Sequence, residues 1–220
     1  IAHLPYKNGK YHCLYLLNPG TMIKPVCNSM YFLLLFSTAA MAQKKTEIGQ
    51  IKTPYGEIMI WLYDETPNHK ASFIQLANAD YWDTYTFNRV VPNFVIQGGC
   101  PDTEEGFTDS TYLLKPEFVL ALKHTYGAFA AGRDNNPGKY SARCQFYIVQ
   151  NKEGVPRLDG NFTIYGKVIK GMDVVEKITQ ADRDKADMPL TPVTLDVNMI
   201  RMKIKVLNKR GIQIPEIPKS

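Results

Sequence analysis

Most of the chain beyond Thr46 shows the two-residue alternation of apolar and polar positions that is typical of half-buried strands. Residues 47–52 and 57–63 alternate on either side of the turn-forming sequence Thr53-Pro54-Tyr55-Gly56, and this arrangement predicts a hairpin. Further strands are predicted at 128–131, 145–149, 163–169 and 193–199, the last of which can continue through 201–207. The pattern therefore predicts a protein built mainly from short strands.

Two segments follow the helical period instead. Thr66 and Pro67 provide an N-cap and a proline at the first helical position, and apolar residues follow at helical spacing, so we expect a helix over 67–80. A second helix is predicted over 172–180, after Gly171. Many short strands with only two helices favour an antiparallel barrel, which has no free sheet edges. The predicted fold class is all-β.

One stretch interrupts the apolar strand pattern with a guanidinium and an amide. It reads Phe87-Asn88-Arg89-Val90-Val91-Pro92-Asn93-Phe94-Val95-Ile96-Gln97-Gly98-Gly99. Arg89 could be a surface arginine on a half-exposed strand, and Gln97 could be a core amide bonded to the backbone. The alternative is that a rigid sheet holds both side chains toward a ligand, as functional sites require.

The first 42 residues differ from the rest of the chain. Lys24 precedes an apolar run, residues 30–36, which leads into the small residues that end at Ala42. A short positive region, an apolar segment of about ten residues and a small-x-small ending are the parts of a secretory signal peptide. A buried helix or a membrane anchor is the alternative, but the run is shorter than the roughly 20 residues that span a bilayer.

We therefore expect a signal peptide over 22–42, beginning at Met22 and cleaved after Ala42, with residues 1–21 as upstream sequence outside the fold. The mature protein is then expected to be periplasmic or secreted, without a membrane span. Its folded domain is expected over 43–207, and residues 208–220 are expected to form a basic, disordered tail.

The net charge of +5 comes from the two ends of the chain. Residues 1–42 hold three lysines and no acid, and residues 201–220 hold six basic residues and one acid. The remaining residues, 43–200, carry 17 basic and 20 acidic side chains. Nucleic-acid binding relies on a concentration of positive charge, so we expect no nucleic-acid partner.

The chain has four cysteines, of which Cys13 and Cys27 lie in the upstream residues and the expected signal peptide. The expected mature protein therefore keeps Cys100 and Cys144. Export permits a disulfide, but the sequence does not show whether the two Cα atoms come within bridging range, and we expect two free thiols. The expected mature chain has no CxxC pair and only two histidines, too few ligands for a zinc site. No metal or cofactor is expected.

Further motifs follow the Phe87–Gly99 stretch in a fixed order. They are Gly127-Ala128-Phe129-Ala130-Ala131-Gly132-Arg133, Gln145-Phe146-Tyr147-Ile148, Leu158-Asp159-Gly160 and Tyr165-Gly166-Lys167-Val168. With Glu117-Phe118, Lys123-His124 and the Gly171-Met172-Asp173-Val174-Val175 helix start, they cover the chain from about Glu47 to Met199. This ordered set resembles the cyclophilin-type peptidyl-prolyl cis-trans isomerases and, given the leader, an exported bacterial member.

The resemblance implies a closed eight-stranded antiparallel barrel capped by two α-helices, with the active site on its outer face. It implies that Arg89 is the main catalytic residue and that Phe94 and Gln97 belong to the same site. The substrate-binding positions that it implies are Val95, Gly132, Arg133, Gln145, Tyr147, Arg157, Leu158 and Phe162. The implied substrates are proline-containing polypeptides, and we expect a monomer.

Several positions depart from the residues most common in the family. Tyr147 stands where phenylalanine is usual, Arg157 where tryptophan is common, and Phe162 where histidine is common. The other departures are Asn88 for histidine, Val95 for methionine, Gly132 for alanine, Arg133 for asparagine and Arg143-Cys144 for glycine-serine. These changes leave the expected arginine and glutamine in place but make the efficiency of the enzyme an open question.

Two other functions are compatible with parts of the sequence. A barrel of this kind could bind proline-containing segments as a chaperone without useful turnover, and the departures at Tyr147, Gly132 and Phe162 favour that alternative. A secreted hydrolase has less support, because His69 and His124 have no serine or cysteine partner motif. Phe94 and Tyr147 could also be ordinary core aromatics.

Overall fold

The computed structural model describes residues 45–100 and 112–217. The expected signal peptide at 22–42, its cleavage point, the upstream residues and the cysteines Cys13 and Cys27 lie outside the described residues. The last three residues of the expected tail, 218–220, lie outside them as well.

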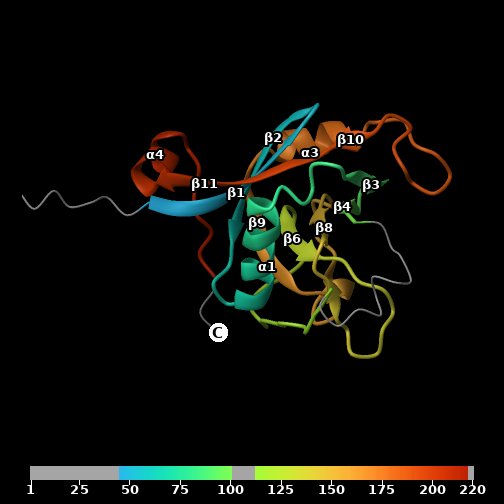
Figure 1. Ribbon diagram of the computed structural model, residues 1–220, viewed down its shortest axis with the longest axis horizontal. Helices are drawn as coiled ribbons and strands as arrows, with labels where there is room; N and C mark the ends of the chain where they lie inside the picture. The colour runs from blue at the N-terminus through green and yellow to red at the C-terminus, as the bar shows by residue number, and fades with distance from the viewer. Residues whose placement is uncertain (1–44, 101–111, 218–220) are drawn as a thin grey trace, which may run out of the picture. The chain divides into compact units, whose positions relative to one another are not determined.

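Most of the described strands belong to one antiparallel sheet with the spatial order β10-β3-β4-β8-β6-β9-β2-β1-β11 (Figure 1). Their bounds are β1 Lys45–Thr53, β2 Gly56–Leu62, β3 Thr86–Val91, β4 Val95–Gly99, β6 Ala128–Ala131, β8 Gln145–Val149, β9 Ile164–Lys170, β10 Val193–Thr194 and β11 Asp196–Lys203. A separate pair consists of β5 Leu113–Leu114 and β7 Ser141–Ala142. The predicted 53–56 turn joins β1 to β2, which pair from Gly49 opposite Ile60 to Thr53 opposite Gly56.

The two ends of this sheet are adjacent in the sequence. β10 pairs with β3 at one end, β11 pairs with β1 at the other, and only Leu195 separates β10 from β11. The Leu195 amide donates a hydrogen bond to the Tyr85 carbonyl. The chain therefore crosses from one sheet edge to the other and brings the sheet close to a closed barrel, as predicted. Counting β10 and β11 as one bent strand accounts for the difference between the nine observed strands and the eight expected.

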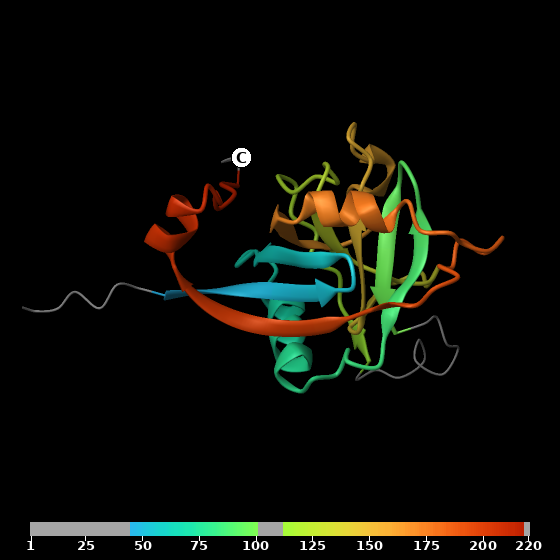
Figure 2. The same cartoon turned by 90° about the horizontal axis from the view of Figure 1, so that it is seen from above.

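The two predicted helices are present, with slightly earlier ends. They are α1 at Pro67–Asn78 and α3 at Met172–Ile178, on opposite sides of the barrel (Figure 2). A short 3₁₀ helix, η1, spans Pro156–Leu158, and α4 spans Ile204–Lys209. None of the helices within 45–100 and 112–217 has the length and apolar character to cross a membrane.

The N-terminus of α1 is capped differently from the prediction. Thr66 occupies the N-cap position, but its hydroxyl makes no capping bond. Glu117 takes this role from a distant part of the chain, since its carboxylate accepts bonds from the amides of Asn68 at 3.1 Å and His69 at 3.0 Å. A carboxylate also complements the positive end of the helix dipole. Glu117 therefore fixes the start of α1 against the barrel.

Aromatic side chains dominate the core between α1 and the sheet. Phe73 of α1 packs edge-on against Phe129 of β6, with ring centroids 5.5 Å apart, and also contacts Trp82 at 5.1 Å. Phe73, Trp82, Phe129 and Phe146 are each almost completely buried. Full burial of a side chain of this size contributes about 1.5–3 kcal/mol, so α1 is held mainly by its apolar face.

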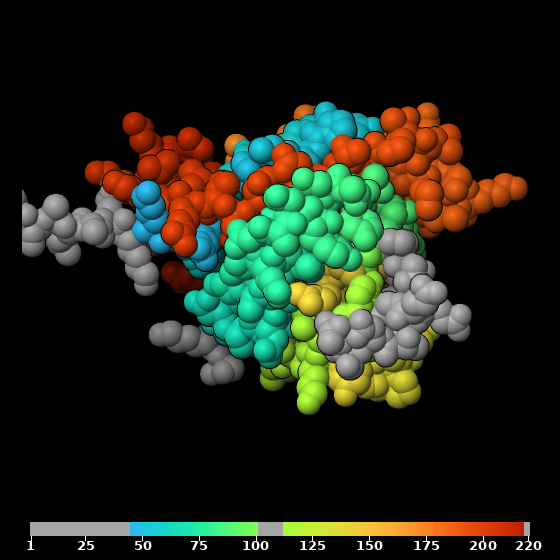
Figure 3. Space-filling view, in the orientation of Figure 1, coloured from blue at the N-terminus to red at the C-terminus, as the bar shows by residue number. Residues whose placement is uncertain are grey.

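The C-terminal segment differs from the expected disordered tail. Leu207 of α4 and Ile212 are buried against Ile48 of β1 and Met59 of β2. Figures 1 and 2 show β1 and β11 running beyond the barrel toward α4, and in Figure 3 the C-terminal segment lies against β1. An apolar cluster separate from the main core therefore orders residues 204–212.

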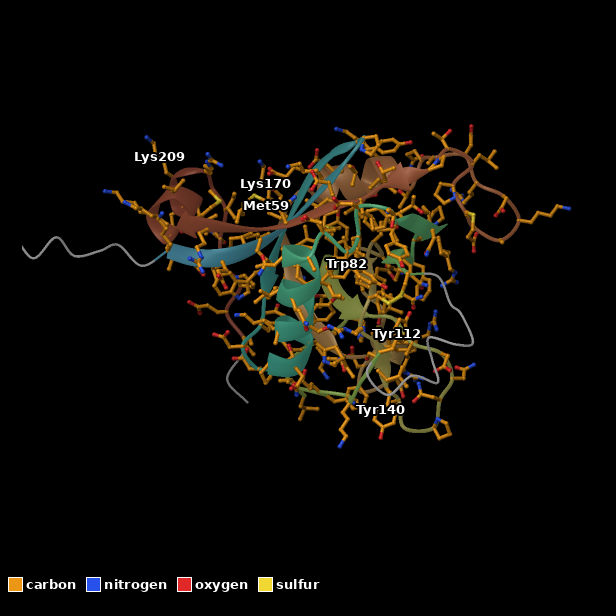
Figure 4. All side chains as sticks on the ribbon, in the orientation of Figure 1. Met59, Trp82, Tyr112, Tyr140, Lys170 and Lys209 are labelled. Atoms are coloured by element: carbon orange, nitrogen blue, oxygen red, sulfur yellow. A yellow bond between two sulfur atoms is a disulfide. The ribbon has the colours of Figure 1, made fainter. Side chains whose placement is uncertain are left out.

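The expectation of two free thiols is wrong in the structure. Cys100, after β4, and Cys144, before β8, form a disulfide with a Cα–Cα distance of 5.5 Å. The register of β4 and β8 explains the contact, because Gly99 lies opposite Gln145 and brings the adjacent cysteines together. Trp82 and Tyr112 lie beside the bridge (Figure 4), and the Trp82 indole donates to the Cys144 carbonyl at 2.8 Å.

Candidate active site

Three predicted site residues form a row across neighbouring strands. Arg89 of β3 lies opposite Gln97 of β4, and Gln97 lies opposite Tyr147 of β8. Side chains that are paired in this way point to the same face of a sheet. The alternate residues Ile96 and Phe146 point into the main core, so the row faces outward. A register shift between Phe87 and Arg89 marks the point where β3 departs from regular pairing.

The row borders a pocket of about 230 Å³. Its lining residues are Arg89, Phe94, Val95, Gln97, Gly132, Arg133, Gln145, Tyr147, Leu158 and Phe162. The structure thus brings all of the predicted site residues to one pocket except Arg157. The Arg157 guanidinium lies outside the lining, 4.7 Å above the centre of the Phe94 ring. Its cation–π contact makes it a support for a pocket wall.

A tight turn presents Phe94 to the pocket. Asn93 has a φ of 58°, in the left-handed region that asparagine tolerates better than most residues. The Asn93 backbone N–H donates to Gln150 Oε1 at 2.7 Å, and the Gln150 backbone N–H donates to the Phe94 carbonyl at 2.8 Å. Gln150 Nε2 also donates to Glu176 of α3 at 2.6 Å. Gln150 therefore positions the turn, a role that the sequence analysis missed.

Gly132 leaves room for the side chain of Gln145. A Cβ atom at position 132 would lie 2.0 Å from Gln145 Oε1 and 2.7 Å from its Cγ. Gln145 Nε2 donates to the Cys100 carbonyl at 3.2 Å. The glycine and the disulfide segment therefore hold this amide in a fixed orientation at the pocket wall.

A chain of hydrogen bonds lies beneath Tyr147. The Tyr147 hydroxyl is 2.9 Å from His124 Nε2, and His124 Nδ1 is 2.8 Å from Asp159 Oδ1. Because an ionised carboxylate only accepts, Nδ1 carries the proton and Nε2 accepts from the tyrosine. From the sequence, His124 belonged to the Lys123-His124 motif and lacked a nucleophile partner, and neither feature predicted its contact with Tyr147 of the pocket.

Burial controls the protonation of this chain. It lowers the pKa of His124 below its ordinary value, and the contact with Asp159 opposes the shift only in part. Burial also holds the pKa of Tyr147 well above its ordinary value. Burial alone would raise the pKa of Asp159, but bonds from the His124 amide and ring outweigh this effect and lower it. At neutral pH this series of hydrogen-bonded groups therefore consists of neutral Tyr147, neutral His124 and the Asp159 carboxylate.

Arg89 is half-buried and stands at the edge of the apolar pocket. Within residues 45–100 and 112–217, its guanidinium has no hydrogen bond or ion pair, so the guanidinium N–H groups can point to a ligand. A second guanidinium, that of Arg133, lies 4.5 Å over the Phe162 ring, and its Nε donates to the Asn161 carbonyl. The described ranges contain no group of three or more histidine, cysteine or acidic side chains that could hold a metal ion.

The arrangement suits an apolar ring that carries an amide. Phe94, Leu158 and Phe162, with the ring of Tyr147, offer apolar surface, while Arg89 and Gln97 place polar groups at its edge. Among the lining residues, only Tyr147 has a hydroxyl beside a base, and it lies beneath the pocket with its pKa held well above the ordinary value by burial, so it is not an activated nucleophile. The pocket can therefore bind and orient an amide by noncovalent contacts.

Comparisons with known proteins point to one family. Residues 48–199 match the family model described as cyclophilin type peptidyl-prolyl cis-trans isomerase/CLD. A peptidyl-prolyl cis-trans isomerase of Acinetobacter baylyi is 34% identical over 179 residues, which cover 80% of this chain and 93% of that protein. Peptidyl-prolyl cis-trans isomerase B of Bacillus subtilis is 37% identical over 122 residues, covering 55% of this chain and 82% of that protein.

The fold is also similar to solved structures. A Cryptosporidium parvum cyclophilin type peptidyl-prolyl cis-trans isomerase, crystallised in the presence of the dipeptide Ala-Pro, matches with a TM-score of 0.61 at 23% identity. The match covers 70% of this chain and 97% of that chain. With the family match over most of the barrel, these findings show that the chain belongs to the cyclophilin type peptidyl-prolyl cis-trans isomerase family.

Proposed function

We propose that the protein catalyses rotation about X-Pro peptide bonds, with Arg89 as the hydrogen-bond donor to the twisted amide. The observation that carries the proposal is the row of Arg89, Gln97 and Tyr147 beside the apolar pocket. Proline is the residue that needs such a catalyst, because its cis and trans amides are close in energy but exchange uncatalysed in roughly 10 to 100 s.

The reaction requires no covalent step. Resonance in the C–N bond gives a rotation barrier of about 18–20 kcal/mol. As the bond twists, resonance is lost and the proline nitrogen regains a lone pair that can accept a hydrogen bond. A fixed donor aimed at this nitrogen therefore binds the twisted amide more strongly than the planar one, and this difference lowers the barrier. Arg89 can supply the donor at any physiological pH, because a guanidinium stays protonated.

The other residues of the pocket bind and orient the substrate. Phe94, Val95, Leu158 and Phe162 would enclose the proline ring, with the Tyr147 ring as the floor. Gln97, directly opposite Arg89, would orient the guanidinium or the substrate carbonyl. Gln145, held at the wall beside Gly132, offers an amide to the substrate backbone.

The assay that tests this function separates an enzyme from a proline-binding chaperone. Cis-to-trans exchange of an Ala-Pro peptide is followed by a protease that cleaves only the trans form, while peptide affinity is measured in parallel. An exchange rate that rises in proportion to protein concentration supports the isomerase. Binding of the peptide with the uncatalysed exchange rate would instead favour the chaperone.

We also propose that the substrates are exported proteins and that the enzyme acts as a monomer. The signal-like pattern at 22–42 supports export, and so does the Cys100–Cys144 disulfide, since disulfides persist mainly in oxidising compartments. N-terminal sequencing of the protein from the periplasm or medium should begin at Gln43. Recovery of the protein only from the cytoplasm, with residues 22–42 attached, would reject the export proposal.

A further inference from the structure

A second hollow lies directly beyond one wall of the proline pocket. Like that pocket, it encloses about 230 Å³, and Phe162 lines both. Its other lining residues are Phe118, Val119, Leu120, Leu122, Lys123, Asp159, Gly160 and Ile164. We call it the Leu120 hollow. From the sequence, Phe162 was the one apolar residue of this hollow with an expected function.

Apolar side chains at the Leu120 hollow remain exposed. Leu120 is 82% exposed and Phe118 is 42% exposed, while Leu122 and Ile164 are buried beneath them. A single exposed leucine is ordinary, but here two large apolar residues stand at a hollow with an apolar base. Exposed apolar groups that gather at a concave site are typical of binding surfaces.

Phe162 connects the hollow to the proline pocket. Its ring meets the Tyr147 ring edge to face at 5.9 Å on the pocket side, and the Arg133 guanidinium lies over it at 4.5 Å. These contacts fix the ring as a dividing wall. Since an extended chain advances about 3.3 Å per residue, a polypeptide with its proline on one side of Phe162 can place another side chain beyond it.

We propose that the Leu120 hollow is a second subsite, which takes a leucine-like side chain of the same polypeptide whose proline occupies the pocket. The proposal rests on the proposed isomerase function and names its substrate class: segments with an apolar residue a few positions from the proline. The shared Phe162 wall favours this occupant over an unrelated ligand, because one extended chain reaches both hollows.

The polar residues at the rim are compatible with such an occupant. Lys123 Nζ lies 3.8 Å from the Asp159 carboxylate, and the Lys139 ammonium lies 5.5 Å over the Phe118 ring. The Asp159 carboxylate is paired with Lys123 and accepts a hydrogen bond from the neutral His124 ring. The hollow therefore presents an apolar base beside an acid that is already paired, which suits an aliphatic side chain better than a charged one.

The test uses peptides that contain one Ala-Pro unit and a single leucine placed two to five residues before or after the proline. Each peptide has a matched version with serine at that position, and the readout is the ratio of the serine peptide's Kd to the leucine peptide's Kd. We expect a ratio of about three to ten at one spacing, from partial burial of one leucine side chain. A ratio near one at every spacing would overturn the proposal.

Two variants locate the effect. Leu120→Ser should bring the ratio close to one, whereas Leu190→Ser should leave it as in the wild type. Leu190 is a fair control because it is 66% exposed, and its segment, 181–192, lies away from 115–125 in both ribbon views (Figures 1 and 2). An unchanged ratio in Leu120→Ser would reject the subsite.

Two further experiments distinguish failure of the subsite from failure of the isomerase function and from self-association at the hollow. Wild-type protein that fails to accelerate exchange of a short Ala-Pro peptide rejects the isomerase function itself, whatever the Kd ratio. Sedimentation of wild-type and Leu120→Ser protein over a range of concentrations tests whether a second copy occupies the hollow. Self-association that is lost in Leu120→Ser would assign the hollow to a dimer contact and overturn the proposed subsite.

Discussion

The Tyr147 hydroxyl lies 2.9 Å from Nε2 of the buried His124. This contact explains how a tyrosine occupies a position where the family usually has phenylalanine. The hydroxyl points below the pocket to a neutral imidazole, which Asp159 holds in the accepting tautomer. The ring is therefore free to serve as the apolar floor of the pocket, and the tyrosine does not by itself favour a chaperone over an enzyme.

Removing that hydroxyl should cost stability more than activity. Tyr147→Phe leaves buried Nε2 of His124 without its donor, so we expect the free energy of unfolding to fall by about 1–3 kcal/mol. Urea denaturation measures the change. Tyr140→Phe is the matched control, because Tyr140 is exposed and should change stability by less than about 0.5 kcal/mol. Equal stability of Tyr147→Phe and the wild type would contradict the proposed hydrogen bond.

Stability should decline as the pH falls below 6.5. Burial lowers the pKa values of His69 and His124 below the ordinary value of 6.5, although Glu117 and Asp159 partly oppose it. Below that pH the unfolded chain takes up protons that the folded chain resists, so the free energy of unfolding decreases toward acid pH and levels off above pH 6.5.

Urea unfolding at pH 7.5, 6.5 and 5.5 measures this dependence. His124→Gln removes one of the two groups and should make the decline between pH 6.5 and 5.5 shallower. Stability that is constant or rises over this interval in the wild type would show that the histidines are not buried as described.

The effects on KM of substitutions at Gly132 and Gln145 should depend on each other. Gly132→Ala would place its Cβ 2.0 Å from Gln145 Oε1 and displace that side chain, so we expect KM for a proline peptide to rise several-fold. In Gln145→Ala the obstacle is gone, and adding Gly132→Ala should then have little further effect. A double-mutant cycle measures the coupling. Strictly additive effects of the two substitutions would mean that the residues act independently.

The disulfide should contribute to stability through the loop that it closes. Cys100 and Cys144 are separated by 44 positions, and for a loop of this size we expect about 2–4 kcal/mol of stabilisation. The double variant Cys100→Ser/Cys144→Ser should unfold at correspondingly lower urea concentration, and a reducing agent should shift the wild type but not the variant. Two titratable thiols in the oxidised native protein that begins at Gln43, and so lacks Cys13 and Cys27, would contradict the bridge.

Much of the fold could be predicted because the sequence pattern is local. Alternation around the 53–56 turn located the first hairpin, and Pro67 located the start of α1. The capping of α1 by Glu117 could not be predicted in the same way, because the two segments are 49 positions apart and meet only in the folded chain. The helix at 204–209, where a continued strand was expected, and the order of residues 208–212 were missed for a similar reason, since Leu207 and Ile212 are buried by the distant β1 and β2.

The site residues also divide into those that the local sequence indicated and those that depend on contacts between distant segments. The Phe87–Gly99 stretch pointed to Arg89 and Gln97, the family resemblance added Phe94, and the structure places all three at one pocket. The supporting residues were less visible. Gln150 and His124 act through contacts with Phe94 and Tyr147 that depend on tertiary structure, and Asp159 acts through His124 in the same way. The cysteine pair became apparent only when the β4–β8 register aligned its neighbours.

The central claim is that Arg89 lowers the barrier to amide rotation. The most direct measurement is the exchange rate of a bound Ala-Pro peptide by NMR, at saturating protein, for the wild type, Arg89→Ala and Arg201→Ala. By analogy with other preorganised donors, Arg89→Ala should slow exchange by roughly 100- to 1000-fold. Arg201→Ala is the control, because Arg201 is an exposed arginine on β11 that pairs only with Glu47 among the described residues. Exchange in Arg89→Ala at the wild-type rate would contradict the account.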